Sequence, residues 1–419
     1  MRSRDGHCVT SGWAAAPAPV VPLPELPGQP AAPRVKVLHV ITKLTDGAGG
    51  NTLLSALGAD RARFEVWVVG SIGGPLWKQA ERHGVRTVKL ARLRARIAPL
   101  DDLRVLFELR RLIRREQFSV VHTHSSKAGF LGRLAAWLCR TPVVVHTIHG
   151  FSFHDFMSPG RRWTYLALER LVRPVTDAFI AVAPQVAREA VERHLVAPGT
   201  ITVVPSAIEL DDIPDQADRP LRAALGVPEG VPLVGTVGRL DFQKAPLDFV
   251  RMAAHVAAAR PRARFVMIGH GALLETARAE ARRLGVDVTF TGFRDDAAQL
   301  AACFDVYVVA SLYEGLGRGL TEALASGRPV CATNVNGVVD LIEPGATGLL
   351  APPRQPEALA ECVIWMLDHP GPATRMGAAG RERVRALFAP RVMCRQIERI
   401  YAQLLGLPEV ETGETCAPR

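Results

Sequence analysis

The sequence predicts an α/β protein with two domains, each a parallel sheet flanked by helices. The chain has 419 residues, enough for two domains of ordinary size. Short apolar runs alternate with segments of helical periodicity along most of it. Two glycine-rich loops, at 47–50 and 315–319, each follow an apolar run and precede a helical pattern. We therefore expect two Rossmann-like β/α/β domains, with ligands bound beyond the carboxyl ends of their strands.

The composition is that of a soluble globular protein. Hydrophobic residues make up 48% of the chain and charged residues 22%. No apolar run reaches the ~18 residues of a membrane span, and prolines interrupt the N-terminal apolar segment, so no signal peptide is expected. The seven cysteines are scattered, odd in number and without a C-x-x-C pair. They indicate reduced, mostly structural thiols in a cytoplasmic protein rather than a metal site.

The first predicted domain spans 34–205. Residues 1–33, rich in Ala and Pro, are expected to be a disordered lead-in. The fold is expected to begin with a strand at 35–41, which runs into Gly47-Ala48-Gly49-Gly50, with Asn51 opening a helix. Helical spacing is clearest at 103–113. Further strands are expected at 64–69, 85–90, 120–123, 143–148 and 179–182.

Histidines mark the ends of two of these strands. His122 and His124 close one strand, and His146 and His149 close the other. Histidines that alternate on a strand can bind a metal, but no carboxylate or cysteine is spaced to complete a site, so we expect none. His39, His122 and His146 are interpreted as structural, while a structural role remains an alternative for the other two.

Positive charge is concentrated in residues 82–117. This stretch holds eleven Lys or Arg against four Asp or Glu, an excess of seven positive charges in a chain of net charge +10. Such a stretch suits an anionic membrane surface, a lipid-linked phosphate or a nucleic acid. No nucleic-acid motif is present, and aromatic residues do not interleave with the basic ones. The alternative is a solvated, arginine-rich helix face.

The second predicted domain spans 206–385, with 206–230 as the linker. Its first strand, 233–240, ends in Gly238-Arg239-Leu240, and Lys244 lies five residues beyond the arginine. Arg offers a planar fork and Lys a compact charge, a combination suited to a dianionic group; surface ion pairing is the alternative. A strand at 265–269 follows, and another at 286–291 leads into Gly292. The helical pattern at 377–407 predicts a C-terminal helix at 386–407, before a tail at 408–419.

The segment 311–330 carries the clearest chemical signal. A predicted strand at 304–310 is followed by Gly315, Gly317 and Gly319 and then by a helix that stops before Pro329. A helix N-terminus favours an anion, and glycines allow a phosphate to approach the backbone. Glu314 and Glu322 frame this turn with seven residues between them. Carboxylates accept hydrogen bonds from sugar hydroxyls, so phosphate and sugar together indicate a nucleotide-sugar. An ordinary βα turn is the alternative.

This E-x7-E arrangement, with its alanine-rich continuation, resembles that of the retaining GT-B glycosyltransferases of group 1, the family-four class, of polysaccharide or glycolipid type. The Gly-Arg-Leu followed by Lys244 resembles the same family, and the likeness extends over residues 35–407. The chain departs from the family pattern at a few positions: Ser206-Ala207, Ala245, Asn336 and Asp340. The resemblance implies a GT-B fold, with two Rossmann-like domains facing each other across a cleft and the C-terminal helix crossing back to the first domain.

The resemblance also implies an activity and a set of site residues. A sugar would pass from a nucleoside-diphosphate sugar, expected to be a UDP-sugar, to a hydroxyl of a lipid-linked or polysaccharide acceptor, with retained anomeric configuration. The implied catalytic residues are Glu314, Arg239, Lys244 and His149. The implied donor contacts are Gly238, Gly292, Phe293, Arg294, Gly315, Leu316, Gly317, Arg318 and Glu322, and the implied cleft residues are Gly49, Gly50 and His124. No cofactor is expected, because the nucleotide-sugar is a substrate, and no divalent metal is expected if cations and backbone amides serve the leaving group.

Other functions compete with this hypothesis. The acceptor could instead be a soluble small molecule, such as a secondary-metabolite aglycone. A non-catalytic nucleotide-sugar-binding subunit is disfavoured, because it need not keep Glu314, Glu322, Arg239 and Lys244 together. A dinucleotide oxidoreductase is disfavoured because neither half has a full fingerprint with its ribose-binding acid. The expected location is cytoplasmic, peripheral on the inner face of the membrane, with no nucleic-acid partner.

Overall fold

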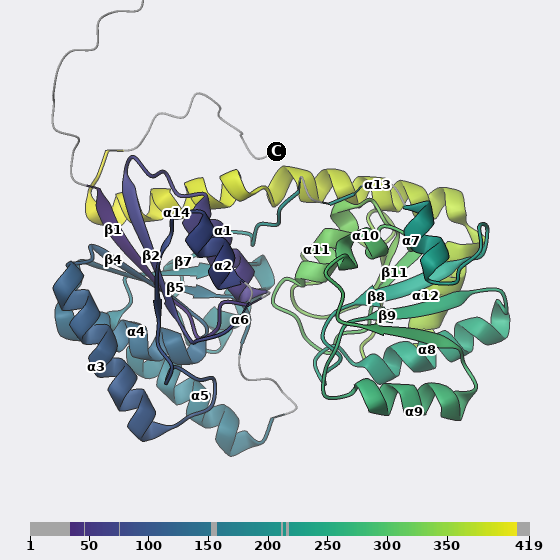
Figure 1. Cartoon of the computed structure of the whole chain (residues 1–419), viewed down its shortest axis with the longest axis horizontal. Coiled ribbons are helices and arrows are strands. Elements are labelled where there is room, and N and C mark those ends of the chain that lie inside the picture. Colours follow the sequence, from purple (N-terminus) through teal and green to yellow (C-terminus); the bar gives the residue numbers. More distant parts are fainter. Residues whose placement is uncertain are drawn as a thin grey trace, which may run out of the picture. The chain divides into compact units, whose positions relative to one another are not determined.

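The computed structural model describes residues 34–45, 47–74, 76–151, 157–210, 213–214 and 218–408. The expected lead-in at 1–33 and nearly all of the expected tail lie outside these residues. The described chain contains two parallel sheets, one of seven strands and one of six (Figure 1). The prediction of an α/β fold with two parallel-sheet domains is confirmed.

The first sheet has the strand order β3-β2-β1-β4-β5-β6-β7, and all neighbouring strands run parallel. Its strands are β1 Val35–Val40, β2 Phe64–Gly70, β3 Arg86–Lys89, β4 Val120–His124, β5 Val143–Ile148, β6 Ala178–Ala181 and β7 Ile201–Val203. Its helices are α1 Ala48–Leu57, α2 Leu76–Arg82, α3 Pro99–Glu116, α4 Ser126–Cys139, α5 Pro159–Val172, the 3₁₀ turn η1 Arg173–Val175 and α6 Pro184–Glu192. The central strands β4 and β5 are buried along their whole length, as expected where helices cover both sides of a sheet.

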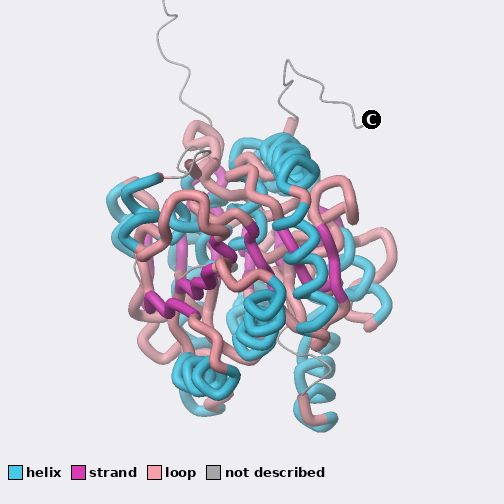
Figure 2. The backbone as a smooth tube through the Cα atoms, turned by 90° about the vertical axis from the view of Figure 1, so that its right-hand side faces the viewer, coloured by secondary structure: helices cyan, strands magenta, loops and turns pink. Residues whose placement is uncertain are grey.

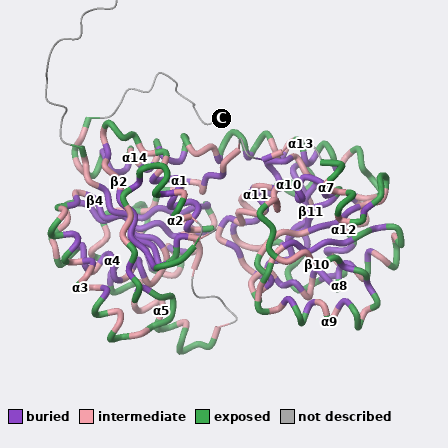
Figure 3. Tube along the Cα trace, in the orientation of Figure 1, coloured by how far each residue is buried: buried purple, intermediate pink, exposed green. Residues whose placement is uncertain are grey.

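Separate apolar clusters pack helices against the two faces of the first sheet. On one face, Leu38 and Val121 pack with Leu109 of α3 and Leu131 of α4. On the other face, Val37 and Val145 belong to a cluster that includes α1 and the C-terminal helix. In Figure 2 the strands lie between helical layers, and Figure 3 shows their buried residues in purple.

The second sheet has the order β10-β9-β8-β11-β12-β13, again parallel throughout. Its strands are β8 Leu233–Val237, β9 Arg264–Ile268, β10 Val288–Gly292, β11 Val306–Val309, β12 Val330–Thr333 and β13 Leu349–Ala351. Its helices are α7 Arg219–Ala224, α8 Pro246–Ala259, α9 Leu274–Leu284, α10 Ala297–Ala301, α11 Arg318–Ala325, α12 Pro356–Asp368 and α13 Pro370–Leu387. Helices α8, α9 and α12 share one core with this sheet, and α11 shares the other.

The chain returns to the first sheet through its last helix, α14 Pro390–Leu405. The Tyr401 hydroxyl lies 2.5 Å from His122 Nδ1, and Met393 and Ile397 join the apolar cluster around Val37. The start of the C-terminal helix expected at 386–407 is wrong, because α13 runs to Leu387 and α14 begins only at Pro390. The helix breaks before Pro390, whose ring and missing N–H cannot continue a helix from the preceding turn.

The first glycine loop also differs from its prediction. Helix α1 begins at Ala48, three residues before the expected start at Asn51, so Gly49 and Gly50 lie in its first turn. Gly47, the residue just before α1, has the positive φ of +69° with which the chain enters this helix. The Asn51 side chain instead accepts a hydrogen bond from the backbone N–H of Ala207 at 3.1 Å, which ties α1 to the segment that follows β7.

Two sequence expectations concern membrane spans and cysteines. None of the helices in the described residues is long and apolar enough to cross a bilayer. Five cysteines, Cys139, Cys303, Cys331, Cys362 and Cys394, are free thiols in the structure. Cys8 and Cys416 lie outside the described part of the chain.

Candidate active site

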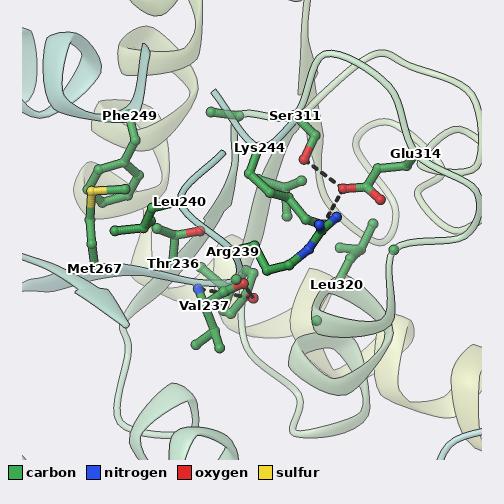
Figure 4. Close-up of a pocket in the computed structure, with 16 residues that line it drawn as sticks. Thr236, Val237, Arg239, Leu240, Lys244, Phe249, Met267, Ser311, Glu314 and Leu320 are labelled. Carbon is green, nitrogen blue, oxygen red and sulfur yellow. Dashed lines mark hydrogen bonds and ion pairs between the residues drawn. The ribbon is translucent and has the colours of Figure 1, made fainter. Parts of the chain in front are cut away.

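A pocket opens where the strand order of the second sheet reverses, between β8 and β11. At such a switch point, the loops that follow the two neighbouring strands diverge and leave room for a ligand. The loop after β8 supplies Gly238, Arg239 and Lys244, and the loop after β11 supplies Ser311 and Glu314 (Figure 4). Strand β8 ends at Val237, so the Gly238-Arg239-Leu240 stretch that the sequence placed inside the strand is loop.

A buried ion pair joins the two loops across this pocket. Lys244 Nζ lies 2.5 Å from Glu314 Oε1, and the Ser311 hydroxyl donates to the same oxygen at 2.7 Å. The Glu314 side chain is only 5% exposed, while that of Lys244 is 25% exposed. Gln243 Nε2 approaches the other carboxylate oxygen at 3.4 Å. The lysine therefore balances the glutamate's charge and still reaches the pocket.

Arg239 differs from Lys244 because its side chain is 70% exposed. Its guanidinium bonds to Asp241 at 2.9 Å and to the Gln243 side-chain oxygen at 3.1 Å. Both partners belong to the same loop and are themselves partly accessible. An exposed pair of this kind is worth little, so an incoming anion can recruit the arginine at low cost.

The glycine turn leads into α11 beside this pair. Gly317, with φ +81°, caps the helix, and the first-turn N–H groups have no acceptor within the helix. A side chain on Gly315 is excluded because its Cβ would lie 1.9 Å from the His149 carbonyl oxygen. The turn therefore places a helix N-terminus at the pocket and holds it against the chain that follows β5.

Glu322 lies one turn further along α11 than the pocket. Its carboxylate accepts from Arg318 Nε at 2.8 Å. The other end of the Arg318 guanidinium adjoins the first turn of α1, since a Cβ on Gly50 would lie 2.3 Å from Arg318 Nη1. The structure thus brings Arg318, Glu322 and Gly50 together. Neither Arg318 nor Glu322 lines the pocket of Figure 4.

The Gly292-Phe293-Arg294 stretch lies two strands away from β8. Gly269 donates its N–H to the Gly292 carbonyl at 2.8 Å, and a Cβ on Gly269 would meet the Gly238 carbonyl. The ends of β8, β9 and β10 therefore form a row of glycine backbone. Phe293 is 70% exposed, and Arg294 pairs with Asp296 at 2.5 Å. This stretch adjoins the pocket's strands but does not line the pocket.

The first sheet places its histidines behind the glycine turn. His149 follows β5 directly, next to Gly315. His124, expected to line the cleft, is instead 1% exposed and bonds to His149 Nε2 through its Nδ1 at 2.9 Å. His124 lies behind His149 because it ends β4, a central strand that helices cover on both faces. Burial lowers the pKa of His149 to about 4, and burial with neighbouring imidazoles lowers that of His124 well below its ordinary value.

The three histidines interpreted as structural are all buried and bonded within the fold. His122 bonds to Tyr401 and to Thr147 Oγ1, and His146 Nδ1 to Thr123 Oγ1 at 2.9 Å. The ring nitrogens of His39, His122 and His124 lie within 4.8 Å of one another, a grouping that could hold a metal ion. Hydrogen bonds already occupy both nitrogens of His122 and His124. A metal ion would have to break them, and within the described residues no carboxylate or cysteine joins the group.

These buried neutral histidines should make the fold acid-sensitive. Burial lowers the pKa of His39 to about 3, so at pH 5 the unfolded chain binds a proton there that the folded chain does not. Stability should therefore be complete above pH 6.5 and decline as pH falls toward 3, with His39 alone costing about 2 kcal/mol between pH 7.5 and 5. Urea unfolding at the two pH values measures this loss. His39→Gln, which cannot titrate, should show a smaller one, and equal pH dependence in both proteins would contradict the assignment.

Sequence reasoning missed two polar residues that contact Glu314: Ser311, which lines the pocket, and Gln243, which lies beside it. Gln243 precedes Lys244, and its side chain bonds to the Tyr313 carbonyl at 3.0 Å, which links the two loops. Ser311 lies three residues before Glu314, and its hydroxyl holds the glutamate in place. The short Ser-x-x-Glu spacing was a signal for the second contact. The first depends on two loops 70 residues apart and left no local pattern.

Known proteins match this chain in sequence and in fold. A model described as Glycosyltransferase Family 4 matches residues 50–212, and one described as Glycosyl transferases group 1 matches residues 231–369. The UDP-Gal:alpha-D-GlcNAc-diphosphoundecaprenol alpha-1,3-galactosyltransferase of Escherichia coli is 27% identical over 343 residues, which cover 80% of this chain and 88% of that protein. The 2-deoxystreptamine glucosyltransferase of Streptomyces kanamyceticus is 32% identical over 346 residues, covering 76% of this chain and 89% of that protein.

A solved structure also matches. The Anabaena HepE protein, crystallised in complex with UDP and glucose, aligns with a TM-score of 0.76 at 20% identity. The match covers 88% of this chain and 100% of that chain. At this identity the likeness establishes the common fold.

Proposed function

The chain belongs to the group 1 family of glycosyltransferases, and on this premise we propose that it moves a hexosyl group from a UDP-sugar to a hydroxyl of a lipid-linked or polysaccharide acceptor, with retention. One observation carries the proposal: Lys244, Arg239 and the N-terminus of α11 converge on the pocket at the switch point of the second sheet. Two cations and a helix N-terminus form a site for a diphosphate. The E. coli relative is named for a UDP-galactose donor, which supports a uridine diphosphate here.

In the proposed reaction, the bond between the anomeric carbon and the diphosphate oxygen breaks. A bond to the acceptor oxygen forms on the same face of the sugar, and the acceptor's proton passes to the leaving phosphate. Negative charge gathers on the diphosphate as it leaves. Arg239, Lys244 and the first-turn N–H groups of α11 would stabilise that charge without a divalent metal. The charge of the leaving diphosphate is therefore stabilised by groups whose positions the fold already fixes.

Glu314 and His149 would meet the sugar. Glu314 Oε1 already accepts from Lys244 and Ser311, so its other oxygen is the better acceptor for a sugar hydroxyl. This double engagement favours a binding role over a nucleophilic one. Glu322 would accept from the ribose hydroxyls, after giving up part of its contact with Arg318.

The acceptor side of the proposal rests on the exposed face of α3. Leu100, Leu103 and Phe107 recur at helical spacing on this face, and Leu100 is 76% exposed. Arg111 and Arg114 continue the same face toward the helix C-terminus and are also exposed. We call these five residues the α3 face. An apolar stripe that runs into a basic one suits an anionic bilayer surface, where a lipid-linked acceptor would lie.

Charge reversal on this face should release the protein from membranes. Arg111→Glu/Arg114→Glu should lower affinity for vesicles of anionic phospholipid by roughly 10- to 100-fold, since each basic residue near the surface contributes about 1 kcal/mol. Wild-type binding should also weaken as salt rises, because screening shortens the reach of exposed charges. Vesicle sedimentation at low and high salt measures both effects.

The matched control is Arg262→Glu/Arg282→Glu, which reverses two exposed arginines in the second half of the chain. It should bind vesicles like the wild type. Equal loss in both double variants, or wild-type binding that salt does not weaken, would count against docking through the α3 face.

A soluble acceptor is the alternative, favoured by the 32% identical relative that is named for 2-deoxystreptamine. The deciding experiment incubates the purified chain with a panel of UDP-sugars and either a polyprenyl-diphosphate sugar or 2-deoxystreptamine. Released UDP and product mass report transfer, and NMR of the product reports the anomeric configuration. Transfer to the lipid acceptor with retention is the expected result. Transfer to 2-deoxystreptamine alone would establish the alternative, and inversion would overturn the mechanism.

A further inference from the structure

Three histidines from separate strands form a continuous line of hydrogen bonds behind the candidate site. His39 belongs to β1, His124 ends β4 and His149 follows β5. His39 Nδ1 lies 2.9 Å from His124 Nε2, and His124 Nδ1 lies 2.9 Å from His149 Nε2. The rings of His39 and His124 are nearly parallel, 10° apart, and both residues are 1% exposed. We call this line the imidazole chain.

Each ring in the imidazole chain is neutral at pH 7. Burial lowers the pKa of His39 to about 3 and that of His149 to about 4. Burial and the neighbouring imidazoles lower the pKa of His124 well below its ordinary value. A neutral imidazole has one N–H donor and one lone-pair acceptor. The three rings together carry three N–H protons. Two of these protons lie in the two internal hydrogen bonds, and the third lies on one of the two outer nitrogens, His39 Nε2 or His149 Nδ1.

This count leaves only two arrangements. His124 uses both of its nitrogens, so it must donate at one and accept at the other. If it donates from Nδ1, then His149 accepts at Nε2 and His39 donates from Nδ1, and all three rings carry their proton on Nδ1. If it donates from Nε2, all three carry their proton on Nε2. Any mixed set would oppose two protons or two lone pairs across a 2.9 Å contact.

We propose that His39 and His124 are positioning residues that tie the tautomer of His149 to their own, so that the state of the imidazole chain sets whether His149 Nδ1 meets the substrate as a donor or as an acceptor. Nδ1 is the ring nitrogen of His149 that the imidazole chain does not use. The proposal rests on the proposed function in one respect, namely that His149 faces the donor sugar. His122 stays outside the chain because Tyr401 and Thr147 occupy its two nitrogens.

The contact between His149 and the glycine turn connects the imidazole chain to the candidate site. A Cβ on Gly315 would lie 1.9 Å from the His149 carbonyl oxygen, so the last member of the imidazole chain is held against the turn that follows Glu314. The first member, His39, lies on the opposite side of His124. The hydrogen bonds that connect His39 to His149 therefore pass through His124.

The test reads tautomers directly. In protein labelled with ¹⁵N at histidine, long-range ¹H–¹⁵N NMR distinguishes protonated from unprotonated ring nitrogens, and single His→Gln variants assign the signals. We expect His39, His124 and His149 to share one tautomer at pH 7.5. Mixed tautomers, or one metal ion bound per chain by elemental analysis with its ligands in this group, would overturn the proposal.

Two variants connect the tautomer to turnover. His39→Leu removes one end of the imidazole chain, and it should shift the His149 ring-nitrogen signals and lower kcat by roughly 10-fold, with little change in KM for the donor. His146→Gln is the matched control, because His146 is equally a buried strand histidine but bonds to Thr123 outside the chain. It should leave the His149 signals and kcat near their wild-type values.

The outcomes separate the two proposals. Unchanged His149 signals in a folded His39→Leu would overturn the imidazole chain as the determinant of the tautomer. If His39→Leu does not fold, the wild-type tautomers still decide the question. Absence of sugar transfer by the wild type would overturn the proposed function alone, since the NMR measurement needs no substrate.

Discussion

Arg239→Ala is expected to lower kcat/KM for the UDP-sugar by roughly 10- to 200-fold, which corresponds to the loss of one charged hydrogen bond of about 1.5–3 kcal/mol. The interaction should strengthen as charge gathers on the leaving diphosphate, so the loss should appear in kcat. Folding should be little affected, because the side chain is 70% exposed and its ion pair with Asp241 lies at the surface. Arg239→Lys should also be impaired, since an ammonium lacks the planar fork.

Lys244→Ala should lower kcat/KM as much as Arg239→Ala does, but a second variant is needed to separate the loss of catalysis from a loss of stability. Removing the ammonium leaves Glu314 as a buried, unpaired carboxylate, which costs roughly 3–5 kcal/mol of stability by itself. Lys244→Ala/Glu314→Gln removes that charge imbalance, so it should recover stability and remain inactive. The Arg239→Ala/Lys244→Ala double loss should be less than additive, because both groups share one anion.

The control for these cations is Arg251→Ala. Arg251 is a partly exposed arginine of α8 that pairs with Asp248 and Glu280 away from the pocket. Its removal should leave kcat/KM unchanged. Wild-type turnover by both Arg239→Ala and Lys244→Ala would reject the diphosphate site, and much of the mechanism with it.

Gly315→Ala should lower kcat by roughly 100-fold, the order of loss expected when reacting groups are displaced by about 1 Å. The new Cβ would lie 1.9 Å from the His149 carbonyl oxygen, so either the glycine turn or the chain after β5 must move. Both segments carry proposed catalytic groups, Glu314 and His149. Thermal unfolding and steady-state kinetics separate loss of geometry from loss of fold.

Gly160→Ala provides the comparison for this substitution. A Cβ at Gly160, in the first turn of α5, meets no other atom within 4 Å. Its kcat should match the wild type. A folded Gly315→Ala with near-wild-type kcat would show that the contact between the glycine turn and His149 is not required.

Local patterns predicted the fold and part of the site. Alternating apolar runs and helical periodicity are local features, and they predicted both parallel sheets. The alternating glycines and the following helix were equally local, so the placement of Glu314 at a helix N-terminus followed from spacing alone. The break before Pro390 was also predictable, because proline cannot continue a helix, but the apolar periodicity on both sides obscured it.

The rest depended on which strands pair. The Lys244–Glu314 ion pair joins loops 70 residues apart that meet only because β8 and β11 are neighbours. The imidazole chain needs β1 and β4 side by side in the sheet, although β2 and β3 lie between them in the sequence. The burial of His124 has the same cause, since a histidine at a strand end is exposed or covered according to its neighbours. Sequence spacing carries no record of these pairings.

The central claim is that UDP binds where the loops after β8 and β11 meet, and hydrogen–deuterium exchange tests it most directly. Saturating UDP should slow exchange in peptides that cover residues 238–244 and 311–320, because the diphosphate orders both loops and accepts from the first-turn N–H groups of α11. Peptides from the α3 face should exchange at unchanged rates. Protection confined to other segments, or none at saturating UDP, would contradict the placement of the donor in this pocket.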